Sequence, residues 1–264
     1  MSDADRTPVD AILRAIETSH QHLRGLLQPL DAAGIRAPAY PTEWSIAQTA
    51  SHLGSGAAIT RARLEAGLDR SEGPGNDVFH PIWDEWNAKS PEENVRDALD
   101  VDRALIDRLV DLDDAQRDAW YLELFGTNDL AGFLRLRLFE HVVHTWDIAV
   151  ALDPTARLAP DAVPLLVDHL AAITHWTAKA TEPARIQVLT ADPDRQFLLD
   201  LGGTSAIGSF DGGDVTATLR ISAEALIRLV YGRLADDHRT PVAPDVIDTE
   251  GTSLEILVAT FPGP

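Results

Sequence analysis

Cysteine is missing from all 264 residues of the sequence. This absence excludes disulfide bonds, zinc sites with thiolate ligands and a cysteine nucleophile. Any reaction of this protein that uses a thiol therefore needs a thiol supplied by another molecule.

Long apolar runs are missing as well. A membrane-spanning helix needs about 20 consecutive apolar residues, and no run in this sequence approaches that length. The polar and acidic start, MSDADRTPVD, is typical of neither a signal peptide nor a transit peptide. We therefore expect a cytoplasmic protein without a membrane partner.

Basic residues are few compared with acidic ones, and the formal net charge is −20 at pH 7. Such a surface repels nucleic acid and anionic lipids, which argues against both as partners. The apolar fraction of 45% allows a substantial core, and 264 residues suffice for one large domain or two ordinary ones. The Gly-rich stretch 202–213 joins strand-like runs and opens no helix, so it does not indicate a phosphate site.

Helical periodicity dominates the first part of the chain. Apolar spacing predicts long helices over residues 8–27, 45–64, 91–112 and 130–152. Ser45 and Gln48 fit a capping box at the start of the second helix, which we expect to break at Gly67. A short helix around Phe79 and Trp86 is expected to cap the core or to line the mouth of a pocket.

The pattern changes after Asp153-Pro154. A helix predicted over residues 161–179 is followed by strand-like runs at 186–190, 196–201 and 215–221, the last with alternation of period two. A helix over 222–234 and an apolar run at 254–261 complete this part. The sequence therefore predicts an α+β protein of two domains, a four-helix bundle over 1–154 and a smaller α+β domain over 155–264.

A candidate metal site lies on the helix predicted over residues 130–152. Glu140 and His144 are four residues apart and thus share one helix face. A carboxylate and an imidazole arranged this way can bind the same divalent metal. Asp147 follows on the same side and could orient His144 through its second ring nitrogen. His52, on the second helix, is the third candidate ligand.

Other interpretations of these histidines remain open from spacing alone. A single Glu–His pair on a helix is often only a solvated surface pair. His141 forms a competing pair with His144, and His52 could be a buried histidine of the core. His20 and His22, on the first helix, have no partner at metal-ligand spacing.

Three short stretches, in this order, resemble the mycothiol-dependent maleylpyruvate isomerase family. They are Trp44-Ser45 opening the helix that carries His52, Glu140-x3-His144-x-Trp146-Asp147, and Gly232-Arg233 closing the helix AEALIRLVYGRL. Members of this family have an N-terminal DinB-like four-helix bundle and a C-terminal domain similar to sterol-carrier domains. The resemblance covers most of the chain and implies this architecture for it.

The resemblance also implies a site. A divalent metal, expected to be zinc, would be held by His52, Glu140 and His144, and mycothiol, a small thiol of actinobacteria, would be the cofactor or cosubstrate. An arginine of the C-terminal domain assists catalysis in the family, and Arg233 is its candidate here. Two nitrogen ligands and one carboxylate leave a coordination position open, where an entering thiol would become a metal-bound thiolate.

Two reactions follow from such a thiolate. It could add to a double bond, permit rotation and leave, which is cis–trans isomerisation, or attack a small electrophile and stay attached, which is S-transfer. Maleylpyruvate is a dianion and the sequence shows no arginine cluster for it, so we favour a thiol transferase, or another mycothiol-dependent enzyme, over the isomerase proper. The alternative is a non-catalytic module that binds a ligand or partner and keeps a vestigial metal site. We expect a monomer or homodimer whose metal faces a cleft between the two domains, next to Arg233.

Overall fold

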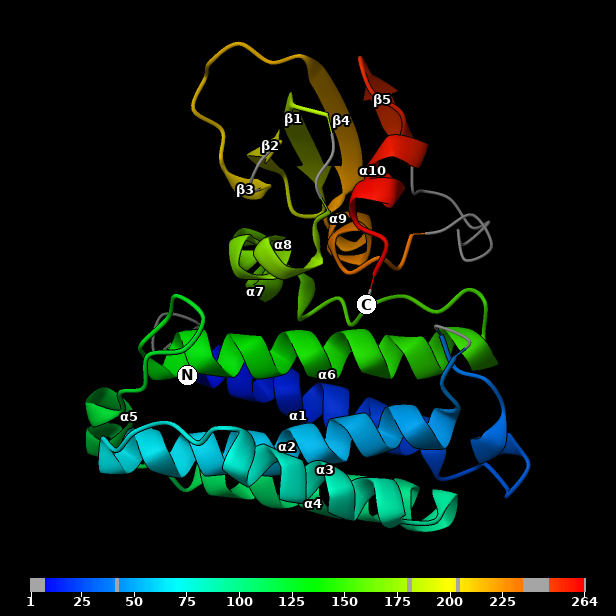
Figure 1. The fold of residues 1–264 in the computed structure, drawn as a ribbon, viewed down its shortest axis with the longest axis vertical. Coiled ribbons are helices and arrows are strands. Elements are labelled where there is room, and N and C mark those ends of the chain that lie inside the picture. The colour runs from blue at the N-terminus through cyan, green and yellow to red at the C-terminus, as the bar shows by residue number, and fades with distance from the viewer. Residues whose placement is uncertain (1–7, 41–42, 180–181, 203–204, 235–246, 264) are drawn as a thin grey trace, which may run out of the picture. The chain divides into compact units, whose positions relative to one another are not determined.

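The computed structural model describes residues 8–40, 43–179, 182–202, 205–234 and 247–263. The chain divides into two compact units, Met1–Asp153 and Pro154–Pro264 (Figure 1). The first unit is helical, and the second contains a five-stranded sheet with short helices. The α+β class predicted from the sequence is therefore confirmed.

Four long helices form the bundle of the first unit. They are α1 (Pro8–Leu27), α2 (Ile46–Asp69), α4 (Pro91–Val110) and α6 (Leu130–Leu152). Helix α1 packs on α4 and α6, and α2 packs on the same two helices, which closes the bundle. Ser45 and Gln48 form the predicted capping box at the start of α2.

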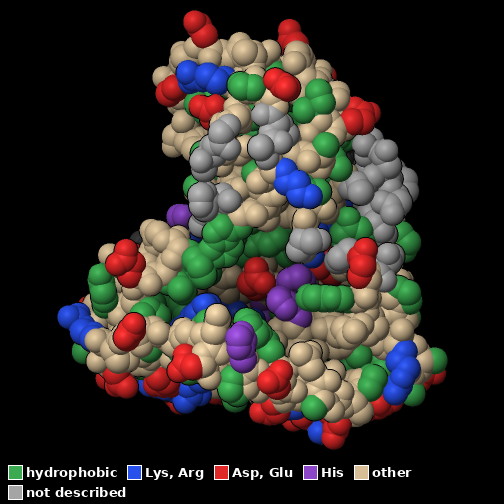
Figure 2. Space-filling model, in the orientation of Figure 1, with side chains coloured by type: hydrophobic (Ala, Val, Ile, Leu, Met, Phe, Trp, Pro, Cys, Tyr) green, Lys and Arg blue, Asp and Glu red, His purple; other side chains and the backbone are tan. Residues whose placement is uncertain are grey.

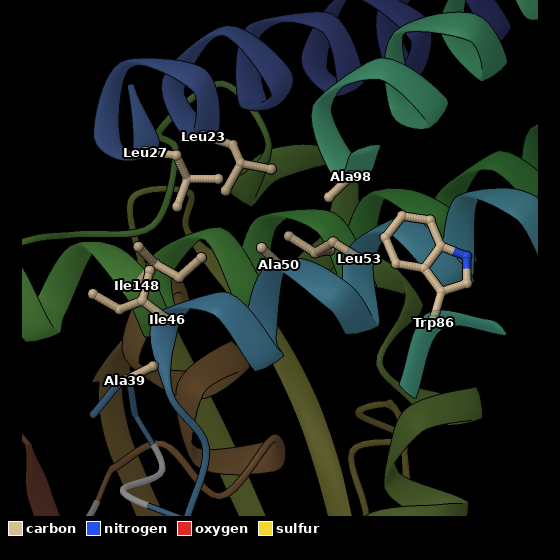
Figure 3. Close-up of a cluster of buried hydrophobic side chains, with 9 residues drawn as sticks. All are labelled: Leu23, Leu27, Ala39, Ile46, Ala50, Leu53, Trp86, Ala98 and Ile148. Atoms are coloured by element: carbon tan, nitrogen blue, oxygen red, sulfur yellow. The ribbon is translucent and has the colours of Figure 1, made fainter. Parts of the chain in front are cut away.

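The hydrophobic core of this unit lies between the long helices (Figure 3). Its buried members come from α1, α2, α4 and α6 and from neighbouring segments: Leu23, Leu27, Ala39, Ile46, Ala50, Leu53, Trp86, Ala98 and Ile148. Burying one large aliphatic side chain contributes about 1.5–3 kcal/mol. The alanines let the helices approach closely, so this core fixes the position of α2 against its neighbours.

Three details of the helical unit differ from the sequence-based expectation. Helix α2 does not break at Gly67, because Trp120 packs there: an added Cβ would lie 2.2 Å from its indole. The short helix around Phe79 is longer than predicted, namely α3 (Asn76–Ala88). The connection before α6 also contains a further short helix, α5 (Asp114–Ala119).

The sheet of the second unit has the strand order β3-β2-β1-β4-β5. Its central strand β1 (Ala184–Ala191) pairs antiparallel with β2 (Arg195–Leu201) and parallel with β4 (Ala217–Ser222). The strands predicted over 186–190, 196–201 and 215–221 correspond to β1, β2 and β4. The edge strands β3 (Ala206–Ser209) and β5 (Asp248–Glu250) were not predicted, because they are too short to produce a clear alternation.

Short helices accompany this sheet. The single helix expected over 161–179 is instead α7 (Val163–Leu166), the 3₁₀ turn η3 (Val167–His169) and α8 (Ala171–Thr177). Helix α9 (Ala223–Val230) ends before residue 234, because Gly232 adopts a left-handed φ of 70°. The last apolar run forms α10 (Leu254–Thr260). Within the described ranges, no helix combines the length and apolar character that crossing a membrane requires.

Candidate functional site

Helix α6 is the element that positions the candidate site. Asp129 caps its first turn by accepting a hydrogen bond of 2.7 Å from the Gly132 amide. Most of the helix is buried, and polar side chains on different faces point to different neighbours. Glu140 and His144 face His52 of α2, whereas Arg137 and His141 face the interior of the bundle.

The structure brings His52, Glu140 and His144 together. The His52 Nε2 lies 3.3 Å from the Glu140 Oε2, and the His144 Nε2 lies 3.5 Å from the same oxygen. The two imidazole rings meet edge to face with centroids 4.5 Å apart. Histidine side chains reach the surface of the helical unit beside acidic and hydrophobic side chains (Figure 2).

This donor set fits a divalent metal of the zinc type. Zinc binds histidine nitrogen and carboxylate oxygen at about 2.0–2.2 Å in a tetrahedral arrangement, so neighbouring ligand atoms lie about 3.3–3.6 Å apart. The two N–O separations, 3.3 and 3.5 Å, match that edge. The side chains of His52 and Glu140 are 39% and 44% exposed, which leaves access for an ion from solvent.

Asp147 lies behind His144. Its Oδ2 is 2.9 Å from the His144 Nδ1, and its side chain is fully buried. A histidine whose Nδ1–H donates to a carboxylate directs its Nε2 lone pair at a metal. Burial alone would lower the pKa of His144, but the hydrogen bonds to Asp147 and Glu140 outweigh it and raise the pKa to about 9.

The electrostatics of the other two side chains favour their ligating forms. Burial lowers the pKa of His52, and the hydrogen bond to Glu140 opposes this only in part. Burial would raise the pKa of Glu140, but the hydrogen bonds to His144 and His52 outweigh it and hold that pKa well below its usual value. At neutral pH Glu140 is therefore a carboxylate and His52 a neutral imidazole, the forms that bind metals.

Trp44 forms a wall of the site. Its indole centroid lies 5.2 Å from the ring of His52 and 6.3 Å from that of His144. The side chain remains partly exposed. Its place next to the helix cap Ser45 signals the start of α2, but the sequence alone does not indicate that it contacts both histidines.

A second cluster of ionisable side chains lies in the interior of the same unit. The Asp102 Oδ2 is 2.7 Å from the His20 Nδ1 and 2.8 Å from the His141 Nε2. Arg137 donates from Nη2 to the Asp102 Oδ1 at 2.7 Å and to the Leu53 carbonyl at 3.1 Å. The partner of His20 is therefore Asp102 of α4, and not a residue of its own helix.

This buried cluster is a structural network that joins the helices of the bundle. Its side chains are at most 5% exposed, and the Asp102 carboxylate is already matched by a guanidinium and two ring nitrogens. His141 therefore lies apart from the group around Glu140. Because Arg137 also holds the carbonyl of Leu53, the network fixes the turn of α2 that carries His52.

Arg233 lies in the second unit, in the turn that ends α9. The Gly232 amide bonds the Leu229 carbonyl at 2.9 Å, and the Arg233 amide bonds the Arg228 carbonyl at 2.7 Å. The Arg233 side chain is buried, with its Nη1 donating to the Tyr231 carbonyl at 2.7 Å. It is thus not an exposed arginine at a helix end, and its role in a site remains a prediction.

Comparisons with known proteins agree with these observations. The profile of the mycothiol maleylpyruvate isomerase N-terminal domain matches residues 16–149. The structure resembles a crystal structure of the mycothiol-dependent maleylpyruvate isomerase, with 17% identity, a TM-score of 0.62, and coverage of 92% of this chain and 99% of that one. A histidine-to-alanine mutant of that enzyme gives 15% identity, a TM-score of 0.63, and coverage of 93% and 98%. Among curated proteins, no sequence match is found.

Proposed function

Because this chain belongs to the family defined by the mycothiol maleylpyruvate isomerase N-terminal domain, we propose that it is a metal-dependent enzyme that uses mycothiol. The observation that carries this proposal is the convergence of His52, Glu140 and His144, whose N–O separations match a zinc tetrahedron. The absence of cysteine supports a thiol that comes from outside the protein.

The chain's own residues would hold and tune the ion. A bound zinc ion with an open coordination position lowers the pKa of an entering thiol, so that the nucleophilic thiolate exists at neutral pH. His52 would contribute a neutral nitrogen ligand and Glu140 one negative charge. His144, whose pKa is raised to about 9, would become a neutral ligand when the metal displaces its Nε2 proton. Asp147 lies within hydrogen-bond distance of the His144 Nδ1, and this contact would keep Nε2 free to bind the ion.

We propose S-transfer to a small electrophile as the reaction. The sulfur forms a bond to carbon, the leaving group departs with its electron pair, and the thiol proton passes to solvent. A dianion such as maleylpyruvate needs cationic partners. Arg137, the arginine closest in sequence to Glu140, is buried and already bound to Asp102, so it does not supply such a partner beside the candidate ligands.

Arg233 is proposed to position the thiol or the substrate. A guanidinium offers a planar fork that binds a carboxylate or amide in a bidentate way. This role rests on the resemblance of the Gly232-Arg233 pair to the family's C-terminal motif.

The decisive experiment combines metal analysis with a reaction screen. The purified full chain, loaded with zinc, is incubated with mycothiol and either maleylpyruvate or one of a panel of neutral electrophiles, and the products are identified by mass spectrometry. We expect about one zinc per chain and a mycothiol conjugate that is lost in His144→Ala. Isomerised maleylpyruvate without a conjugate would favour the isomerase. A chain without stoichiometric zinc or turnover would be a binding module instead.

A further inference from the structure

A cavity of about 410 Å³ lies within the helical unit, and His52 is the candidate metal ligand in its wall. Trp44 and His52 belong to its wall and also to the group around Glu140. Trp83 and Trp86 of α3 line it too, together with Asn94 of α4. The cavity is therefore continuous with a ligand of the metal and is formed by helices α2, α3 and α4.

Asn94, a residue of the cavity wall, has an unsatisfied polar atom. Its side chain is 7% exposed, and its Oδ1 is buried without a hydrogen-bond partner among the described residues. A buried acceptor without a partner destabilises the folded protein, because its hydrogen bonds to water are lost and not replaced. A ligand that brings an N–H or O–H donor to this oxygen would remove that cost.

The charges around the cavity do not favour an anion. Lys89 is the cation of its wall, and its Nζ already lies 3.0 Å from a Glu85 oxygen and 3.1 Å from an Asp97 oxygen. The same ammonium lies 4.3 Å from the centroid of the Trp86 ring. Its charge is therefore balanced, and the formal net charge of the chain, −20, opposes anions further.

The aromatic residues of the cavity wall favour a ligand that contains a ring. Trp83 and Trp44 are 41% and 38% exposed, so their indoles offer free apolar surface at the cavity. Indole rings pack against flat or cyclic groups through their faces, while polar side chains such as Gln48 and Ser51 also line the wall.

We propose that this cavity binds the non-reacting body of the thiol, as an uncharged ring that carries hydroxyl or amide donors. Asn94 accepts a hydrogen bond from the ring, and Trp83 packs against it. Because the cavity shares His52 with the metal group, a body bound there keeps its sulfur within reach of the ion. The inference rests on the proposed function, since it takes the thiol to be the molecule at the metal.

The test measures binding of the body apart from the chemistry of the sulfur. S-methylmycothiol keeps the rings of mycothiol but has no thiol, so it reports on the cavity alone. Its affinity for the zinc-loaded full chain is measured by isothermal titration calorimetry. We expect Asn94→Leu to weaken binding roughly threefold to tenfold, the effect of one hydrogen bond, and Trp83→Ala to weaken it at least about twofold.

Matched controls separate this effect from loss of structure. Asn76→Leu makes the same change at an exposed position of α3 outside the cavity wall and should leave affinity unchanged. Trp83 is partly exposed, so Trp83→Ala should fold even if Asn94→Leu does not. Zinc content should stay constant in all three variants.

The outcomes distinguish this inference from the proposed function. Weaker binding in both cavity variants supports the inference, even if the wild type shows no turnover and the proposed function fails. Unchanged affinity in both variants overturns it. A wild type that converts mycothiol but does not bind S-methylmycothiol also overturns it, while the proposed function stands.

Discussion

His141 and His144 are three residues apart on α6, yet they belong to different groups of side chains. His144 is partnered by Glu140 and by Asp147, whereas His141 is fully buried and bonded to Asp102. Sequence spacing does not distinguish the two histidines, because the Glu140–His144 pair and the His141–His144 pair are both compatible with a metal. The residues that face them from other helices decide their roles.

The first prediction concerns the ligands. His52→Ala, Glu140→Gln and His144→Ala should each lose zinc, because each removes one of the three candidate ligand atoms. Zinc per chain, measured by inductively coupled plasma mass spectrometry after dialysis, checks this. His141→Ala should keep zinc, and His22→Ala, an exposed histidine of α1, is the control. Loss of zinc from His141→Ala alone would show that the ligand set is wrong.

The second prediction concerns Asp147. Asp147→Asn removes the carboxylate that orients His144, so zinc affinity should fall roughly 10–100-fold, the usual effect of losing such a partner. Competition with a chromogenic chelator measures the affinity. Asp129→Asn makes the same substitution at the start of α6, where asparagine caps as well as aspartate. Equal affinity in both variants would remove Asp147 from the site.

At the scale of the elements, glycines in α2 show why this helix fits its neighbours. The indole of Trp86 occupies the space beside Gly54, where an added Cβ would lie 2.1 Å from a ring carbon. Trp120 fills the corresponding space beside Gly67. The sequence suggests that glycine breaks a helix, whereas here the missing side chain allows a tryptophan to pack on it.

The third prediction compares two glycines in helices. Gly54→Ala should lower the free energy of unfolding by about 1–3 kcal/mol, the cost of overpacking. A Cβ added at Gly25, in α1, would meet no atom within 4 Å. Gly25→Ala should therefore raise the free energy of unfolding by up to about 1 kcal/mol, because alanine favours helices. Unfolding in guanidinium chloride measures both. A stabilised Gly54→Ala would show that Trp86 can move without cost.

The network around Asp102 connects α1, α4 and α6. Burial would raise the pKa of Asp102, but the charges of His141 and Arg137 and the hydrogen bonds to His141 and His20 outweigh it, so that the pKa falls well below its usual value. A carboxylate with a lowered folded-state pKa stabilises the native state fully above its unfolded-state pKa, about 3.9. This stability disappears as the pH falls below that value toward the folded-state pKa.

The fourth prediction follows from the lowered pKa of Asp102 in the folded state. Asp102→Asn should destabilise the protein by about 3–5 kcal/mol at pH 7, because Arg137 is left as an uncompensated buried charge. Its stability should also depend less on pH below pH 4 than that of the wild type. Urea unfolding at pH 7 and pH 3 measures both effects. Asp100→Asn, at an exposed position of α4, should leave both unchanged.

At the scale of the whole molecule, the long elements were predictable and the short ones were not. Helices α1, α4 and α6 begin and end close to the predicted residues, because caps and apolar spacing reinforce each other over many turns. The 3₁₀ turn η3 and the strands β3 and β5 have three or four residues each, too few for periodicity. Likewise, spacing indicated the Glu140–His144 pair, but the partnership of His20 with Asp102 depends on packing between helices.

The whole chain is needed for the fifth prediction, because Arg233 belongs to the second unit and the candidate ligands belong to the first. If Arg233 binds the thiol or the substrate, Arg233→Lys should reduce turnover or thiol affinity at least several-fold, since an ammonium cannot reproduce a bidentate contact. Zinc content should be unchanged. Steady-state kinetics with mycothiol, together with metal analysis, measures these quantities.

A purely structural role of Arg233 must be separated from this one, because its Nη1 also bonds the Tyr231 carbonyl. Arg228→Lys provides the matched comparison, since Arg228 is buried in the last turn of α9 and its Nε donates to the Arg233 carbonyl at 3.3 Å. If both variants lose thermal stability but only Arg233→Lys raises the KM for mycothiol, Arg233 contacts the thiol. If stability falls equally and the kinetics of both remain those of the wild type, Arg233 only closes the turn after α9 and does not belong to the site.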